Sequence, residues 1–178
     1  MHALAQQLFA CGMALALAGC GTAPVQGTST QELQQNRAAA GERMVATVRA
    51  AAGNGDGELA IQPLRDAQVE DLRQQAHAFE QQRRYADAAR VLDQALAIVP
   101  DDPAVLQERA EAALLLRDYT GAERFAQRAF DRGSQVGPLC RRHWAAIRQA
   151  RFARNDGAGA AQAQTALDAC RVAPPARY

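Results

Sequence analysis

The chain has 178 residues, a formal net charge of +1 at pH 7, 22% charged residues and 5% aromatic residues. This length suits one domain of about 100–150 residues with short appendages. The balanced charge gives no reason to expect a nucleic acid or a strongly charged surface as the partner. Alanine is abundant and β-branched residues are scattered singly, so the composition predicts an all-α fold.

A short apolar segment, Leu8 to Ala18, lies near the amino terminus and is interrupted only by Gly12. It is shorter than the roughly 20 apolar residues that a membrane-spanning helix needs, but it is typical of a signal-peptide core. The sequence Leu-Ala-Gly-Cys at 17–20 resembles the lipobox of bacterial lipoproteins, in which cleavage precedes a cysteine that carries lipid. The departure is residues 1–7, which contain no Lys or Arg where that family has a positive charge. A buried amphipathic helix that happens to contain a cysteine is the alternative interpretation.

The lipoprotein resemblance implies that residues 1–19 are a signal peptide and that Cys20 carries three acyl chains. Several chains together hold a protein stably on a membrane. Residues 20–30 are small, polar and interrupted by proline, so they are expected to form a flexible tether. Gly21 follows the anchor in place of the aspartate of an inner-membrane retention signal. By resemblance, we expect the outer membrane of a Gram-negative bacterium, facing the periplasm. A cytoplasmic protein with a misread signal is the alternative.

Residues 31–66 are predicted to form a leading helix and a loop. The helix begins near Thr30, where Ser29 or Thr30 itself can cap its exposed amides, and ends before Gly53. Its apolar stripe is narrow and consists of Met44, Val45 and Val48. We therefore expect this helix to pack weakly or to serve as a spacer. Residues 58–64 are expected to form an extended segment against the helices that follow.

Residues 67–136 contain one pattern written twice, at a constant offset of 34 residues (106 minus 72). The matched pairs include Leu72 with Leu106, Ala76 with Ala110, Tyr85 with Tyr119, Ala88 with Ala122 and Ala95 with Ala129. Self-similarity at this period is typical of helical solenoids. An ordinary antiparallel helical bundle has the same local geometry, but it would not need matched tyrosines and alanines at one offset.

This pattern resembles the tetratricopeptide repeat, a family that builds each unit from two antiparallel helices. Phe79 takes the family's aromatic place in the first unit, and Pro100 takes its terminal place. The second unit departs from the pattern at Ala113 and Ser134. The resemblance implies a short α-solenoid of about three antiparallel helix pairs over residues 67–172, followed by a tail at 173–178.

The third helix pair does not keep the repeat register. Counting from Arg141 places Trp144 and Ile147 at the two large positions, which requires a four-residue insertion between units. Arg148 then occupies a position where a small residue belongs, so we expect a degenerate unit.

Two cysteines mark the ends of this third pair. Cys140 stands at the start of its first helix and Cys170 at the end of its second, and those ends are neighbours in an antiparallel hairpin. They are the two thiols left once Cys11 is removed and Cys20 is lipidated. An even pair in an oxidising compartment predicts a disulfide. Two buried reduced thiols are the alternative.

Motifs for catalysis or metal binding are not found in the sequence. There is no Ser-His-Asp ordering, nucleotide loop or histidine pair at metal spacing. We therefore expect a protein that is not an enzyme, with no cofactor and no metal. An enzyme or redox protein that uses the cysteines or Glu80 and Glu111 is the alternative from another functional class.

The family resemblance implies a binding surface. In proteins similar to this one, the first helix of each unit lines a concave groove that receives an extended peptide or a partner helix. Mapped onto this chain, the candidate groove residues are Arg73, His77, Glu80, Gln107, Glu111, Leu114, Arg142 and Gln149. The lysine and asparagine set with which some relatives clamp chaperone carboxyl termini is missing, so that activity is not expected.

The resulting prediction is a lipid-anchored adaptor that binds a protein or peptide of the cell envelope. Lipoproteins similar to it assist pilus or secretin assembly, support outer-membrane machinery, or regulate cell-wall enzymes. No nucleic acid and no small-molecule substrate are expected. The sequence does not identify the partner or define the oligomeric state.

Overall fold

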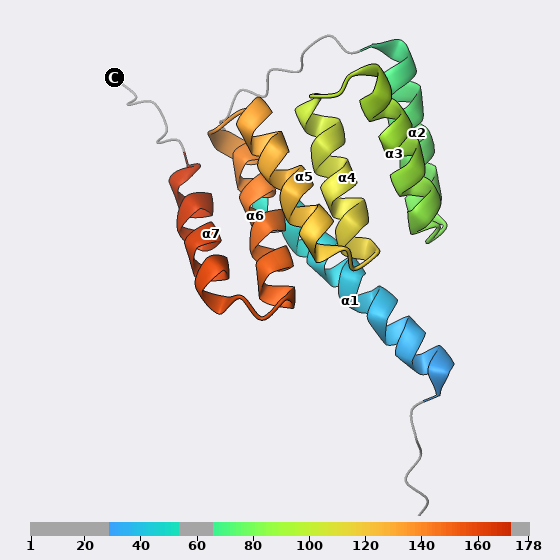
Figure 1. Cartoon of the computed structure of the whole chain (residues 1–178), viewed down its shortest axis with the longest axis horizontal. Helices are drawn as coiled ribbons and strands as arrows, with labels where there is room; N and C mark the ends of the chain where they lie inside the picture. The colour runs from blue at the N-terminus through green and yellow to red at the C-terminus, as the bar shows by residue number, and fades with distance from the viewer. Residues whose placement is uncertain (1–28, 54–65, 172–178) are drawn as a thin grey trace, which may run out of the picture.

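The computed structural model describes residues 29–53 and 66–171, which form seven α-helices and no strand (Figure 1). The helices are α1 (Thr30–Ala51), α2 (Ala67–Gln81), α3 (Tyr85–Ile98), α4 (Pro103–Leu115), α5 (Tyr119–Arg132), α6 (Gly137–Ala153) and α7 (Gly157–Ala169). The predicted all-α solenoid is confirmed. The predicted signal peptide, Cys20, most of the tether, the segment at 58–64 and the tail lie outside the described residues.

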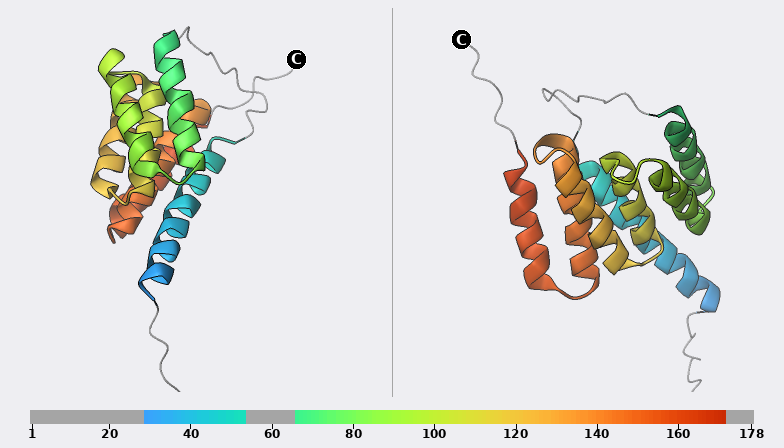
Figure 2. Two further views of the ribbon diagram at one scale, coloured as in Figure 1. Left: turned by 90° about the vertical axis from the view of Figure 1, so that its right-hand side faces the viewer. Right: turned by 45° about the horizontal axis from the view of Figure 1, so that its top comes forward.

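Helices α2 to α7 form three antiparallel pairs that stack in chain order. We call α2–α3 the first repeat, α4–α5 the second and α6–α7 the third (Figures 1 and 2). Adjacent repeats pack through α3 against α4 and through α5 against α6. Alanines with almost no exposed surface lie along the packed helices and allow close backbone approach, among them Ala76, Ala88, Ala95, Ala110, Ala122 and Ala129.

The turn inside each repeat shows where the third one departs from the period. Arg83, Arg117 and Asn155 each adopt a left-handed backbone, with φ of 59°, 64° and 63°. The first two lie 34 residues apart and the last two 38 apart (155 minus 117). Helix α6 has 17 residues where α4 has 13, so four extra residues form one extra turn of α6. The expected four-residue insertion therefore lies inside a helix, and because it is close to 3.6 residues the faces of α6 keep their orientation.

The arginine at the small position of the third repeat also has a structural explanation. Arg148 bridges the two helices of its own repeat, because its guanidinium donates a hydrogen bond to Gln164 Oε1 on α7.

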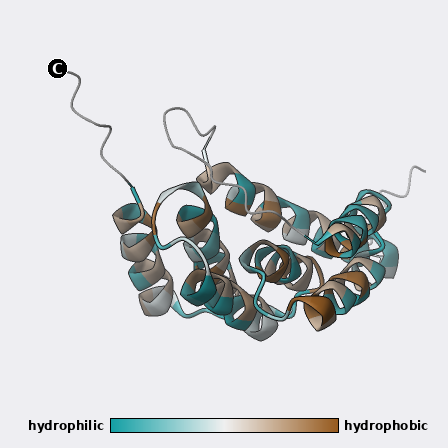
Figure 3. Cartoon of the chain, turned by 90° about the horizontal axis from the view of Figure 1, so that it is seen from above, coloured by the Kyte–Doolittle hydropathy of each residue, from teal (hydrophilic) through white to brown (hydrophobic). Residues whose placement is uncertain are grey.

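Helix α1 is an integral part of the fold, and the expectation of a weakly packed spacer was wrong. It lies across α4 and α6, on the side of the solenoid formed by the first helices of the repeats (Figure 3). The narrow stripe is buried, with Val45 at 3% and Val48 at 0% exposure. A Cβ atom at Gly41 would lie only 3.2 Å from the Cα atom of Leu115. A glycine within a helix costs about 1 kcal/mol relative to alanine, and here it permits this close approach.

The end of α1 is fastened by α6. Arg141 donates hydrogen bonds from Nε to the carbonyl oxygen of Ala51, at 3.1 Å, and from Nη2 to that of Ala52, at 2.6 Å. These carbonyls lack partners within α1, and a cation also interacts favourably with the carboxyl end of a helix. The opposite end of α1 is exposed over residues 30–37 and projects past the repeats (Figure 1).

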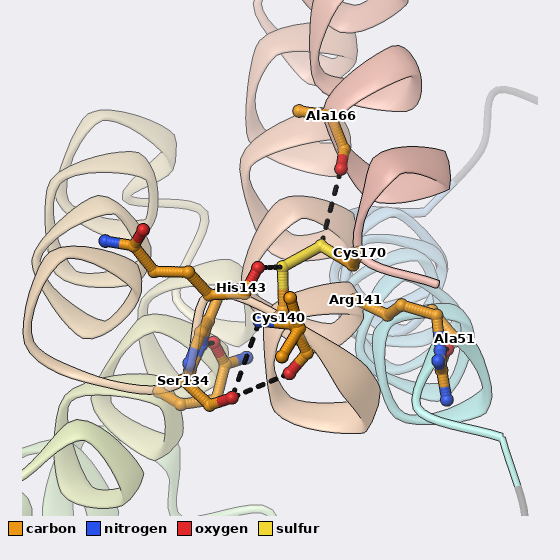
Figure 4. The surroundings of a disulfide bond; sticks show 10 residues. Ala51, Ser134, Cys140, Arg141, His143, Ala166 and Cys170 are labelled. Carbon is orange, nitrogen blue, oxygen red and sulfur yellow. Dashed lines mark hydrogen bonds between the residues drawn. A yellow bond between two sulfur atoms is a disulfide. The ribbon is translucent and has the colours of Figure 1, made fainter. Parts of the chain in front are cut away.

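The cysteines of the third repeat are joined by a disulfide in the structure (Figure 4). The Cα atoms of Cys140 and Cys170 lie 5.7 Å apart, and each residue is 1% exposed. The amide of Gly137 also donates a hydrogen bond to the carbonyl oxygen of Cys170, at 2.7 Å. The extra turn of α6 is thus tied to the end of α7, the last helix of the described residues.

We expect the paired substitutions Cys140→Ala and Cys170→Ala to lower the free energy of unfolding by about 3–4 kcal/mol. The two residues are separated by 30 positions, and a cross-link of this span restricts the unfolded chain by that amount. Urea titration with and without reductant measures the effect. Reductant should destabilise the wild-type protein to the level of the variant and leave the variant unchanged. Alkylation of free thiols in unreduced, unfolded protein would contradict the pairing.

Candidate binding site: a cleft between α1 and the first repeat

A cleft of about 490 Å³ lies between α1 and the first repeat, beside α4. Its floor is apolar and is made mostly of small side chains, namely Ala76, Ala88, Leu92 and Ala112. Its walls are polar and consist of Arg49, Glu70, Arg73, Gln74, His77, Glu80, Glu108 and Arg142. Helix α1 packs on α4 and α6 and leaves this part of the face open.

The structure separates the candidate groove residues that line the cleft from those that do not. Four line the cleft, and these are Arg73, His77, Glu80 and Arg142. Three others, Gln107, Glu111 and Leu114, are 0–1% exposed and are not available to a partner, which corrects the predicted surface. They are covered because α1 and α6 pack over them. Gln149 is half-buried on α6 and is not part of the cleft lining.

Glu111 is the centre of a buried polar cluster beneath the cleft. It accepts hydrogen bonds from Arg142 at 2.5 and 2.8 Å, from Arg49 at 2.8 Å and from the Gln107 amide at 2.9 Å. Burial raises the pKa of the Glu111 carboxyl, but the charges of Arg142 and Arg49 outweigh this effect and hold the pKa below its usual range. The carboxylate is therefore charged, and three different side chains pair with it.

Arg49 connects this cluster to the first repeat. Its Nε bonds Glu111, while Nη1 and Nη2 lie 2.8 and 2.9 Å from the two carboxylate oxygens of Glu80 on α2. Burial lowers the pKa of Arg49, and its bonds to Glu80 and Glu111 more than reverse this, so the pKa lies above the ordinary value. Arg49 is not among the residues predicted from the sequence. Its position directly after Val48, at the edge of the apolar stripe, is the signal that would have indicated it.

The remaining walls are also held by ion pairs. Arg73 binds Glu108 through two nitrogens and Glu70 through a third, so α2 and α4 are joined across the floor. A second opening of about 390 Å³ lies on the other side of the Arg49–Glu80 pair. There, Glu42 of α1 accepts hydrogen bonds from Tyr85 at 2.5 Å and from Arg83 at 3.3 Å. Two polar bridges therefore connect α1 to the first repeat, one from Arg49 to Glu80 and one from Glu42 to Arg83 and Tyr85.

The comparisons with known proteins agree with the repeat architecture. The tetratricopeptide repeat family profile matches residues 69–112. The solved structure of the globular C-terminal domain of P. aeruginosa LpoP is 30% identical, with a TM-score of 0.56, and the match covers 59% of this chain and 99% of that one. The chain belongs to the tetratricopeptide repeat family. No curated protein matches it. The repeat fold supports a protein-binding role and a non-enzymatic one.

The two cysteines that an enzymatic or redox alternative would use are joined in a disulfide. Cys140 and Cys170 are buried and bonded to one another, so neither presents a thiol. Within residues 29–53 and 66–171 no group of three His, Cys, Asp or Glu side chains is placed to hold a metal. No helix in these ranges is long and apolar enough to cross a membrane.

His143 extends the buried cluster on the other side of Gln107. Its Nδ1 lies 2.7 Å from Gln107 Oε1, and because that oxygen accepts, the proton of the neutral ring is on Nδ1. Nε2 is buried and finds no hydrogen-bond partner among the described residues. Burial and the charge of Arg142 lower the pKa of His143 to about 4, although Glu111 opposes the shift. The ring is therefore neutral at pH 7.

We expect acid to destabilise the protein through His143. The pKa of His143 in the folded protein, about 4, lies below its ordinary value of 6.5. Its contribution to stability is complete above pH 6.5 and is lost as the pH falls toward 4, to a total of about 3 kcal/mol. Urea titrations at pH 7.5 and 4.5 measure the loss, which should be smaller in His143→Gln. The control His77→Gln removes an exposed histidine and should keep the wild-type difference. Equal differences in all three proteins would contradict the prediction.

Proposed function

We propose that this protein is a lipid-anchored adaptor of the cell envelope. Cys20 would hold it at the outer membrane, and the repeats would bind a protein or peptide partner in the periplasm. The observation that carries the proposal is the cleft between α1 and the first repeat, which is open, apolar at its floor and polar at its walls. The lipobox-like sequence at 17–20 supports the anchor.

The dimensions of the cleft favour an extended segment of the partner over a helix. One turn of a helix is 5.4 Å high and 10–12 Å across with its side chains, so it fills about 500 Å³. The cleft has about 490 Å³ and would hold only a single turn. An extended segment of a few residues places alternate side chains on the floor and toward the walls. Assembly of pilus, secretin or outer-membrane machinery and regulation of cell-wall enzymes are the roles that such an adaptor would serve.

The anchor is tested by labelling cells with radioactive palmitate. We expect the wild-type protein to incorporate label and to sediment with membranes, and Cys20→Ala to do neither, because lipid attachment needs the thiol. The matched control replaces Cys140 and Cys170 with alanine and should keep the label. Unlabelled wild-type protein in the soluble fraction would favour the cytoplasmic adaptor instead.

The binding site is tested by a photo-crosslinking amino acid introduced into the full chain in cells. Gln74 is exposed and lines the cleft, so a crosslinker at this position should give a discrete adduct with the partner. Gln94 is exposed on α3 outside the cleft lining and serves as the matched control, for which no adduct is expected. Mass spectrometry of the Gln74 adduct identifies the partner. Adducts at Gln94 alone, or equally at both positions, would contradict binding in the cleft.

A further inference from the structure

The guanidinium of Arg49 is held differently on its two sides. On the inner side its Nε bonds Glu111, which is 1% exposed and is also bound by Arg142 and Gln107. On the outer side Nη1 and Nη2 pair with Glu80, whose side chain is 25% exposed. The inner carboxylate is fixed by its other partners and by its burial. The outer carboxylate borders the cleft and is free to exchange with another one.

Glu80 is the more exchangeable partner of Arg49, because its side chain is 25% exposed and water can replace the guanidinium. An exposed ion pair contributes about 0.2–1 kcal/mol, and the two parallel hydrogen bonds place this pair toward the upper end of that range. Glu80 also lies in the last turn of α2, which contains no basic residue, and a carboxylate at that end of a helix is opposed by the helix dipole. Little free energy is therefore lost when Glu80 turns from Arg49 into solvent.

Arg49 is also the accessible arginine of the cleft. Its side chain is 39% exposed, whereas those of Arg73 and Arg142 are 15% and 23% exposed. Arg73 is already bound by two carboxylates, and Arg142 binds Glu111 through two nitrogens. The lining contains three arginines and three glutamates. The buried Glu111 adds a fourth carboxylate, so the charges balance at three against three when Glu80 swings away. A carboxylate of the partner then takes the place of the one that left.

We propose that Arg49 is a specificity-determining residue that binds a carboxylate of the partner in the place that Glu80 occupies in the free protein. The partner is then an acidic peptide segment, and its backbone lies along the apolar floor beside Ala76 and Ala112. A guanidinium holds a carboxylate through two parallel hydrogen bonds, and Glu111 fixes its orientation in advance. This inference rests on the proposed function and adds to it the chemistry of the ligand. It also makes α1, which lies outside the repeats, one wall of the site.

The substitution Glu80→Gln distinguishes this proposal from a purely structural role of the Arg49–Glu80 pair, because the two predict different effects on peptide binding. If Arg49 and Glu80 only fasten α1 to the first repeat, Glu80→Gln loosens that junction and improves no binding. If Glu80 is an internal competitor, the same substitution releases Arg49 and tightens binding of an acidic peptide. The expected gain is about two- to fivefold, the equivalent of the exposed ion pair.

The probe is a library of synthetic random octapeptides, prepared once with free carboxyl termini and once with amidated termini. The full chain is screened against both, and the affinities of selected peptides are measured by fluorescence anisotropy. We expect selected sequences to share an Asp or Glu at one position. Arg49→Gln should weaken their binding about tenfold or more, and Arg49→Lys less, because lysine keeps the charge but loses the paired geometry. Enrichment only in the free-carboxyl set would identify the chain end as the source of the carboxylate.

Two controls separate recognition from folding. Arg43→Gln removes an exposed arginine from α1 and should leave the affinities unchanged. Replacing the shared acidic residue of a peptide with its amide should weaken binding to the wild-type protein but not further weaken binding to Arg49→Gln. The inference is overturned if the screen yields no binder or if the selected peptides show no preference for acidic residues. It is also overturned if Glu80→Gln binds the selected peptides no more tightly than the wild-type protein does. If either result is obtained but a crosslinker at Gln74 still gives an adduct with a partner, the proposed adaptor function is supported and the preference for an acidic ligand is not.

Discussion

The buried carboxylate of Glu111 is the constraint on which the arrangement of the helices around α4 depends. An uncompensated charge at 1% exposure would cost several kcal/mol, so every helix that contributes a partner must stay in place. Those partners come from α1 through Arg49, from α6 through Arg142 and from α4 itself through Gln107. The cost of desolvating these charges offsets much of their mutual attraction, so the cluster adds little net stability. Its main effect is to fix the positions of the helices that contribute to it. Because Arg49 is bound at one end, its other end faces the cleft in a fixed direction.

The extra turn of α6 explains why the third repeat departs from the pattern of the other two. That turn carries Cys140, and Arg141 follows it directly. Figure 4 shows Arg141 pointing toward Ala51 at the end of α1, while His143 points to the other side of α6. One insertion therefore places the link to α7, the cap of α1 and the buried histidine next to α4 within a single turn of helix. The irregular repeat is the one that fastens the leading helix to the solenoid.

The repeats could be predicted from the periodicity of the sequence. The docking of α1 and the buried polar cluster could not, because they depend on residues that are far apart in the sequence. The 34-residue offset fixed the first two helix pairs, and counting from Arg141 located the four-residue insertion. The docking of α1 was missed because its stripe of Met44, Val45 and Val48 is narrow, and because a glycine in a helix does not reveal what approaches it. Gln107 and Glu111 were assigned to the groove because they lie on the first helix of the second repeat, which lines the groove in similar proteins. Their partners His143 and Arg49 lie 36 and 62 residues away, beyond the reach of any local pattern.

The contacts between α1 and the three repeats differ in strength, and this difference explains why the open site lies at the first repeat. The third repeat is held to α1 by Arg141 and closed by a disulfide, and the second packs on Val45 and Val48 through its apolar core. The first repeat meets α1 mainly through exposed polar bridges, each worth a fraction of a kcal/mol to about 1 kcal/mol. Elements with few buried contacts open at the lowest free energy. The cleft therefore lies at the junction that adjusts most easily to a partner, beside a core that does not.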